Sequence, residues 1–149
     1  MYKILQKFLF LNLFFTILIF TGCSQSNKES KNSRWYTKDM VEKGKPLYES
    51  NCASCHGLMG EGIAKVWSKK MPNGKYPPPP LNSEAHAYHH PLKALRFTIQ
   101  NGGEVIGGVM PAFNNKLNKE QTDNIIAYFQ EFWGDEFYKE WLKRGGLKK

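Results

Sequence analysis

Residues 51 to 60, NCASCHGLMG, place two cysteines three positions apart and a histidine directly after the second. This Cys-x-x-Cys-His pattern is the attachment motif of a c-type haem. Two thiols about one helical turn apart can each add across a vinyl group on one edge of the porphyrin, and the imidazole that follows then lies beneath the iron. The motif therefore predicts thioether bonds at Cys52 and Cys55 and a proximal iron ligand at His56.

Two other chemistries use the same thiols. A zinc site would combine Cys52 and Cys55 with His86 and His90, but the 30 intervening residues are far more than a zinc finger has. A thiol–disulfide site needs a strand–helix–strand context, which the sequence does not indicate. The sequence favours covalent haem over both alternatives.

The iron of such a haem has a second axial position, and Met110 is the candidate ligand for it. Met110 follows His56 by 54 residues in GGVMPAF, where Gly107 and Gly108 allow close backbone approach. A thioether opposite an imidazole raises the reduction potential, which suits electron transfer. Met59 is too near His56 in sequence to reach around the macrocycle. The alternatives are an open position on the iron and a ligand from the histidine-rich turn, which contains His86, His89 and His90. For these three histidines, a solvated turn is the simpler interpretation.

The first 22 residues predict an export signal. Lys3 and Lys7 precede an uncharged apolar run over 8–20, which is shorter than the roughly 20 residues that span a bilayer. The run ends in FTGC, which resembles the lipobox of bacterial lipoproteins. We therefore expect a signal peptide over 1–22 and a lipidated Cys23 at the start of a flexible tether over 23–35. Ordinary secretory cleavage and an uncleaved anchor are the alternatives, and each would export the domain to the cell envelope.

The chain is basic, with 21 Lys and Arg against 13 Asp and Glu and a formal charge of +8. In an exported protein this charge suggests acidic protein partners or an anionic membrane face, and it argues against nucleic acid. A solvated basic surface is the simpler interpretation.

Helical periodicity dominates the rest of the chain, and no segment alternates long enough to predict a strand. Asn118 and Gln121 form a capping-box pattern at the start of the most strongly amphipathic segment. Pro46 should kink the first helix or mark where its regular part begins. The segment YPPPPL, 76–81, is stiff polyproline-like chain, not an element. We therefore expect an all-α fold of three or four short helices, over 38–50, 91–101, 118–133 and 135–144.

Several stretches together resemble the class I, mitochondrial-type, cytochromes c in their bacterial mono-haem form. The resemblance runs from about Asp39 to Trp133. The loop over 63–76, the HAYHHP segment and the tail after Gly134 depart from the family pattern. The matching stretches are GKPLYESNCASCHGLMGEG, PPL at 79–81, the helix before NGG, GGVMPAF and LNKEQTDNIIAYFQEFW.

The resemblance implies a cytochrome c-like fold around one covalent haem c, over 36–134, with an amphipathic extension over 135–149. The first and last helices of the family domain would cross, so that Gly44 and Tyr48 meet the last helix near Tyr128. A proline carbonyl within 78–80, which we assign to Pro80, would accept the Nδ1 hydrogen of His56.

The function implied is one-electron transfer between redox partner proteins with acidic docking surfaces. A six-coordinate iron leaves no position for a substrate, so we do not expect the chain to be an enzyme by itself. The alternatives are a haem-based ligand sensor, an electron-transfer subunit of a larger oxidoreductase complex, and a metal-binding module that uses the three histidines.

Overall fold

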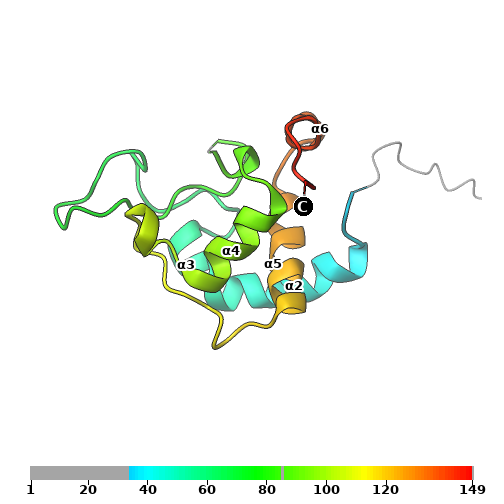
Figure 1. The fold of residues 1–149 in the computed structure, drawn as a ribbon, viewed down its shortest axis with the longest axis horizontal. Coiled ribbons are helices and arrows are strands. Elements are labelled where there is room, and N and C mark those ends of the chain that lie inside the picture. The colour runs from blue at the N-terminus through cyan, green and yellow to red at the C-terminus, as the bar shows by residue number, and fades with distance from the viewer. Residues whose placement is uncertain (1–33, 85, 149) are drawn as a thin grey trace, which may run out of the picture. The chain divides into compact units, whose positions relative to one another are not determined.

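The structure is a computed structural model that describes residues 34–84 and 86–148. The predicted signal peptide, Cys23 and most of the predicted tether lie outside these residues. Within them the chain is helical, its isolated extended pairing is one parallel bridge between Tyr76 and Gly108, and no helix is long and apolar enough to cross a membrane. The elements are α2 (Lys38–Asn51), α3 (Ala53–His56), η2 (His86–His89), α4 (Leu92–Asn101), η3 (Glu104–Ile106), α5 (Lys119–Gln130) and α6 (Asp135–Lys143), as Figure 1 shows.

The predicted all-α class is confirmed, and the helix ends shift slightly. Helix α2 is assigned as one helix through Pro46. Helix α4 begins one residue later than expected because Pro91 has extended backbone and acts as its N-cap. The capping box of α5 is present, with Asn118 Oδ1 accepting from the Gln121 amide at 2.8 Å. The four-residue α3, formed by the Cys-x-x-Cys-His motif itself, is an addition.

Helices α2 and α5 cross in the most extensive helix–helix contact of the described residues (Figure 1). At the crossing, a Cβ on Gly44 would lie 2.6 Å from the Asn124 carbonyl carbon and 3.0 Å from Tyr128 Cβ. One turn later, the buried Tyr48 ring packs on Tyr128 with centroids 5.3 Å apart. The expected contact of Gly44 and Tyr48 with the last helix of the family domain is thus present.

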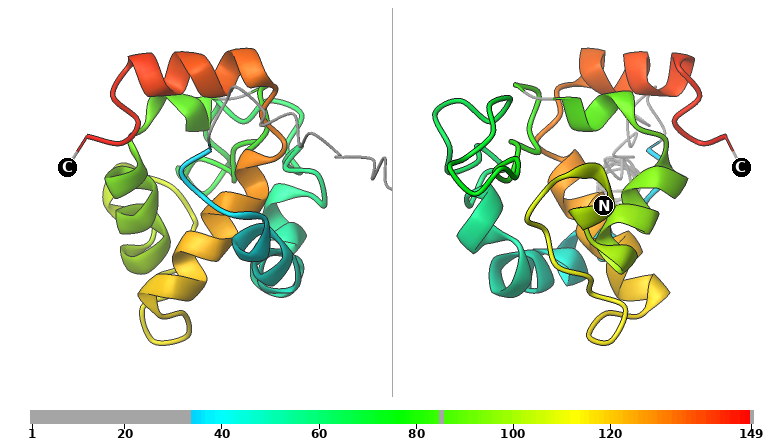
Figure 2. Two further views of the ribbon diagram at one scale, coloured as in Figure 1. Left: turned by 90° about the vertical axis from the view of Figure 1, so that its right-hand side faces the viewer. Right: turned by 60° about the vertical axis from the view of Figure 1, so that its left-hand side comes forward.

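Helix α6 packs on the rest of the domain. Figure 2 shows it lying across the end of the domain that holds η2 and the start of α4. Its Tyr138 and Trp141 side chains are each 1 % exposed, and the Trp141 ring lies 5.9 Å from that of Trp133. The amphipathic face seen in the sequence is therefore part of the core.

We expected Arg34 and Trp35 to belong to a flexible tether, but both residues bond to the folded domain. The Trp35 amide donates to Tyr138 Oη at 2.8 Å, and its indole donates to Gln130 Oε1 at 2.6 Å. Arg34 pairs with Asp135 at 2.9 Å. Both residues bond to α5 or α6, and the composition of the neighbouring polar segment does not predict such distant partners.

Gly44→Ala should lower the free energy of unfolding by about 1–3 kcal/mol, because the added methyl group forces the two helices apart. Helix propensity alone would favour alanine by about 1 kcal/mol, so the sign of the change separates the two effects. Urea unfolding followed by circular dichroism measures it. Gly134→Ala is the matched control, since nothing lies within 4 Å of a Cβ there. A Gly44→Ala protein as stable as the parent would contradict the tight crossing.

Candidate functional site

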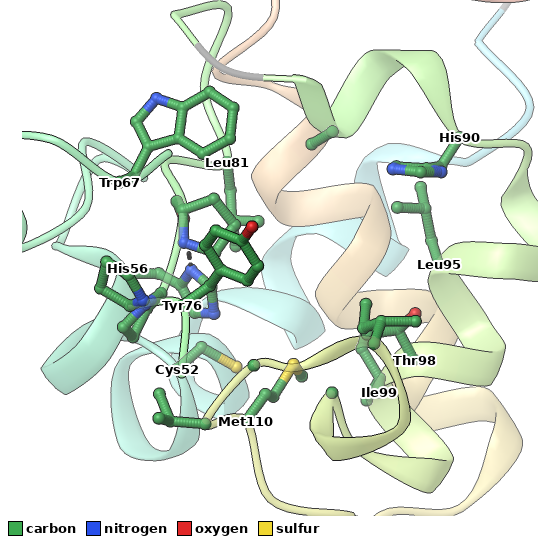
Figure 3. A pocket seen from close by; sticks show the side chains of 18 of the residues that line it. Cys52, His56, Trp67, Tyr76, Leu81, His90, Leu95, Thr98, Ile99 and Met110 are labelled. Atoms are coloured by element: carbon green, nitrogen blue, oxygen red, sulfur yellow. Dashed lines mark hydrogen bonds between the residues drawn. The ribbon is translucent and has the colours of Figure 1, made fainter. Parts of the chain in front are cut away.

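The structure contains a cavity of about 430 Å³, a volume suited to a bound cofactor. Figure 3 shows Leu95, Thr98 and Ile99 of α4 along one side, and His56 and Leu81 on the other. Ile125 and Phe129 of α5 also contribute to its lining, which is mostly apolar. A flat apolar group with a few polar attachments fits such a space.

The attachment motif lies where α2 gives way to α3. Cys52 ends one helix and begins the other, and its carbonyl accepts hydrogen bonds from the amides of Cys55 and His56 at 3.0 and 2.9 Å. The Cys52 side chain is buried on the cavity, whereas Cys55 is exposed, and both are free thiols. Burial, and secondarily the neighbouring Cys55, raises the pKa of the Cys52 thiol to about 11.

His56 is 7 % exposed and faces the cavity. Its Nδ1 lies 2.8 Å from the Pro79 carbonyl oxygen. Because a carbonyl can only accept, Nδ1 must carry the hydrogen, which leaves the Nε2 lone pair for a metal. Burial lowers the pKa of His56, although the bond to Pro79 opposes this effect, so the imidazole is neutral at neutral pH.

The acceptor of the His56 hydrogen is Pro79, and our assignment of Pro80 is wrong. Successive carbonyls of a polyproline segment point in different directions, about three to a turn, so the sequence alone does not select one of them. Pro80 instead packs beside Gly62, where a Cβ would lie 3.2 Å from the proline ring. The Gly62 amide donates to the His56 carbonyl at 2.6 Å.

Met110 lines the same cavity as Cys52 and His56. The Gly103 amide donates to the Met110 carbonyl at 2.9 Å, and a Cβ on Gly102 would lie 2.8 Å from that carbonyl. Gly102 also has a φ of +82°, in the left-handed region that favours glycine. The close backbone approach that we expected at Gly107 and Gly108 therefore occurs chiefly at the earlier glycine pair, Gly102 and Gly103.

His89 and His90, the two histidines of the HAYHHP segment whose side chains the structure describes, do not gather into a metal site. His90 lines the cavity, but Figure 3 places it near the start of α4, well away from Met110. His89 Nδ1 lies 2.6 Å from Arg144 Nη1, and its ring packs on Tyr88. Among the side chains that the structure describes, no three His, Cys, Asp or Glu residues are grouped to hold a metal ion. The His86 side chain lies outside that description.

Sequence reasoning missed the side chains that close the cavity. Trp67 and Tyr76 line it from the loop that departs from the family pattern, and Leu95, Thr98 and Ile99 line it from α4. The available sequence signal for Trp67 was that it is a lone tryptophan within a polar loop. The residues present fit a haem c, because a buried thiol, a correctly oriented imidazole and a thioether all open onto one largely apolar space.

Comparison with known proteins gives the family. The family described as "Cytochrome C oxidase, cbb3-type, subunit III" matches residues 39–129. The chain is 33 % identical over 105 residues to the cbb3-type cytochrome c oxidase subunit CcoP of Azospirillum brasilense, covering 70 % of this chain and 32 % of the relative. It is 28 % identical over 96 residues to subunit FixP of Azorhizobium caulinodans, covering 64 % and 28 %.

A smaller protein is also similar. Cytochrome c6 of a Synechococcus strain is 28 % identical over 101 residues, which cover 68 % of this chain and 74 % of the relative. The chain spans about a third of the length of the cbb3 subunits that it matches. Since the family match covers more than half of the sequence, the chain belongs to the cbb3-type cytochrome c oxidase subunit III family of c-type cytochrome domains, whose haem c is covalently bound.

Proposed function

We propose that the protein is an exported mono-haem c-type cytochrome that carries single electrons between redox partners in the cell envelope. One observation carries the proposal: Met110, 54 residues after His56 in the sequence, opens onto the same largely apolar cavity as Cys52 and His56. When bound there, haem supplies the one-electron iron couple.

Each chain residue has a separate part in holding the group. Cys52 and Cys55 would form the two thioether bonds, from the buried and the exposed end of the motif. His56 would bind the iron through Nε2, held in orientation by its bond to Pro79. Met110 would supply the opposite ligand. The apolar lining of the cavity would exclude water from the haem, so that no solvent has to rearrange there when the iron changes its oxidation state.

This ligand set would make the chain an electron carrier and not an enzyme, because its own side chains, His56 and Met110, would hold the iron and leave no position for a substrate. The relatives favour a second candidate, an electron-transfer subunit of a larger oxidoreductase, since CcoP and FixP are named as oxidase subunits. Both candidates use the same haem site and differ in the partner.

Charge supports an acidic partner. The loop over 63–76, which we term the basic loop, exposes three lysines beside Trp67, a residue that lines the cavity. Positive charges beside the cavity would attract an acidic protein and orient it toward the haem. The three lysines are Lys65, Lys69 and Lys70.

The sequence supports attachment to a membrane. We propose a signal peptide over 1–22, lipidation at Cys23 and a tether that ends at Ser33, since Arg34 and Trp35 contact α5 and α6. This arrangement would hold the cytochrome domain in the envelope near its partners.

Met110→Ala should remove the methionine-to-ferric charge-transfer band from the visible spectrum, lower the reduction potential and let carbon monoxide bind the reduced protein. Spectra of the oxidised and reduced holoprotein measure these changes. Met59→Ala is the matched control, because Met59 is 62 % exposed. A parent protein that already binds carbon monoxide rapidly would instead support the ligand-sensor alternative.

Oxidation of the reduced protein by anionic ferricyanide should slow about tenfold between roughly 10 mM and 500 mM salt, because salt screens the attraction. Oxidation by cationic tris(phenanthroline)cobalt(III) should accelerate with salt. Replacing the three lysines of the basic loop by glutamine should weaken both effects. The matched control replaces three α2 lysines that each pair with a carboxylate four residues away: Lys38, Lys43 and Lys45. Rates independent of salt would exclude electrostatic steering.

Cys23→Ala should move the haem-bearing protein from the membrane fraction to the soluble fraction, since the lipid attachment point is lost. Ser24→Ala serves as the control and should leave the protein with the membranes. Fractionation followed by haem staining measures the distribution. A Cys23→Ala protein that stays with the membranes would contradict the lipid anchor.

A further inference from the structure

The two ends of the described chain pack on each other outside the family-matched region of 39–129. Arg34 pairs with Asp135, and its guanidinium carbon lies 4.1 Å from the centre of the Tyr138 ring. The Trp35 amide donates to Tyr138 Oη at 2.8 Å. Helix α6 is thus fixed on one side by the segment that precedes α2, and its other side faces η2 and α4.

On that other side, the C-terminal segment bonds to the main chain at the start of α4. The Trp141 indole donates to the His90 carbonyl at 2.8 Å, and the Leu92 amide donates to the Gly146 carbonyl at 2.7 Å. The first amides of a helix lack partners within the helix, and Pro91 at the N-cap supplies no side-chain acceptor. The Gly146 carbonyl therefore does for α4 what an N-cap side chain does for most helices.

The position of that carbonyl depends on how α6 ends. Gly145 has a φ of +85°, its amide donates to Leu142 at 3.0 Å, and the Gly146 amide donates to Trp141 at 2.8 Å. These two bonds form a Schellman motif, which turns the chain back toward α4. The Trp141 ring covers Gly146 so closely that a Cβ there would lie 2.7 Å from the ring atom Cε3.

Helix α4 connects this cap to Met110. Its Leu95 and Ile99 side chains line the cavity, and the Ile99 carbonyl accepts from the Phe113 amide at 3.0 Å. The glycine pair after the helix then holds the Met110 main chain through the 2.9 Å bond from Gly103. A shift at the start of α4 would therefore reach Met110 through two bonded positions, Gly103 before it and Phe113 after it.

We propose that Trp141 and Gly146 are positioning residues for Met110: the C-terminal segment over 135–148 is a latch that holds α4 and keeps the Met110 thioether opposite His56. The proposal rests on the proposed role of Met110 as an iron ligand. Opening of the latch releases the Met110 side of the cavity without unfolding the α2–α5 crossing, which is the most extensive helix–helix contact of the described residues and does not involve α6.

The rate of cyanide binding to the ferric holoprotein tests the latch, because cyanide takes the position that Met110 leaves. Trp141→Phe keeps an aromatic ring and loses the indole donor. It should bind cyanide roughly tenfold faster than the parent, the effect of losing one buried hydrogen bond. Gly146→Ala should act in the same direction. Hydrogen exchange at the Leu92 amide should accelerate in both variants, a readout that does not depend on the haem.

Two controls separate the latch from general destabilisation. Gly44→Ala weakens the α2–α5 crossing on the His56 side of the cavity and should raise the cyanide rate less than Trp141→Phe does, since global unfolding is rarer than local opening. Lys139→Ala changes an exposed residue of α6 and should behave like the parent. Cyanide binding at the parent rate in Trp141→Phe, or equal acceleration in Gly44→Ala, would overturn the latch alone. A parent holoprotein without the methionine band would overturn both this proposal and the assignment of Met110.

Discussion

The crossing of α2 and α5 at Gly44 is the contact on which the rest of the domain depends. Without a side chain at this position, the α2 backbone can approach the Asn124 carbonyl, and the Tyr48 ring can pack on Tyr128 one turn later. Helix α2 then ends at Cys52, so the crossing also sets where the attachment motif stands relative to the α5 side chains of the cavity. A contact between two helices thereby fixes one wall of the site.

The rest of the lining comes largely from irregular segments, and hydrogen bonds to their main chain hold it in place. Pro79 is bonded to His56, the Leu81 carbonyl accepts from the Trp133 indole at 2.7 Å, and the segment after α4 is bonded to Gly103. Irregular segments with few helical bonds are suited to this task because their amides and carbonyls are free to bond across the cavity.

The sequence predicted what depends on local chemistry. The capping box at Asn118 and the thiols and imidazole of the attachment motif each follow from residues within a few positions of one another. It failed where the outcome depends on tertiary geometry. Of the four adjacent prolines, those at 78–80 offered three candidate carbonyls, and only the fold places that of Pro79 against His56. Similarly, Trp35 follows a polar segment, and its partners lie about a hundred residues away.

The same distinction explains why the C-terminal segment was difficult to interpret. Its apolar face predicted an amphipathic helix over 135–144, but that pattern does not identify the partner of the helix. The partner follows from a deficiency elsewhere: α4 begins after a proline, so its first amide requires an acceptor that its own N-cap cannot provide. The Gly146 carbonyl meets that requirement. The start of α4, which lacks an acceptor, and the tight turn at the end of α6 are therefore complementary. Together they explain why the tail belongs to the core although it lies outside the family-matched residues.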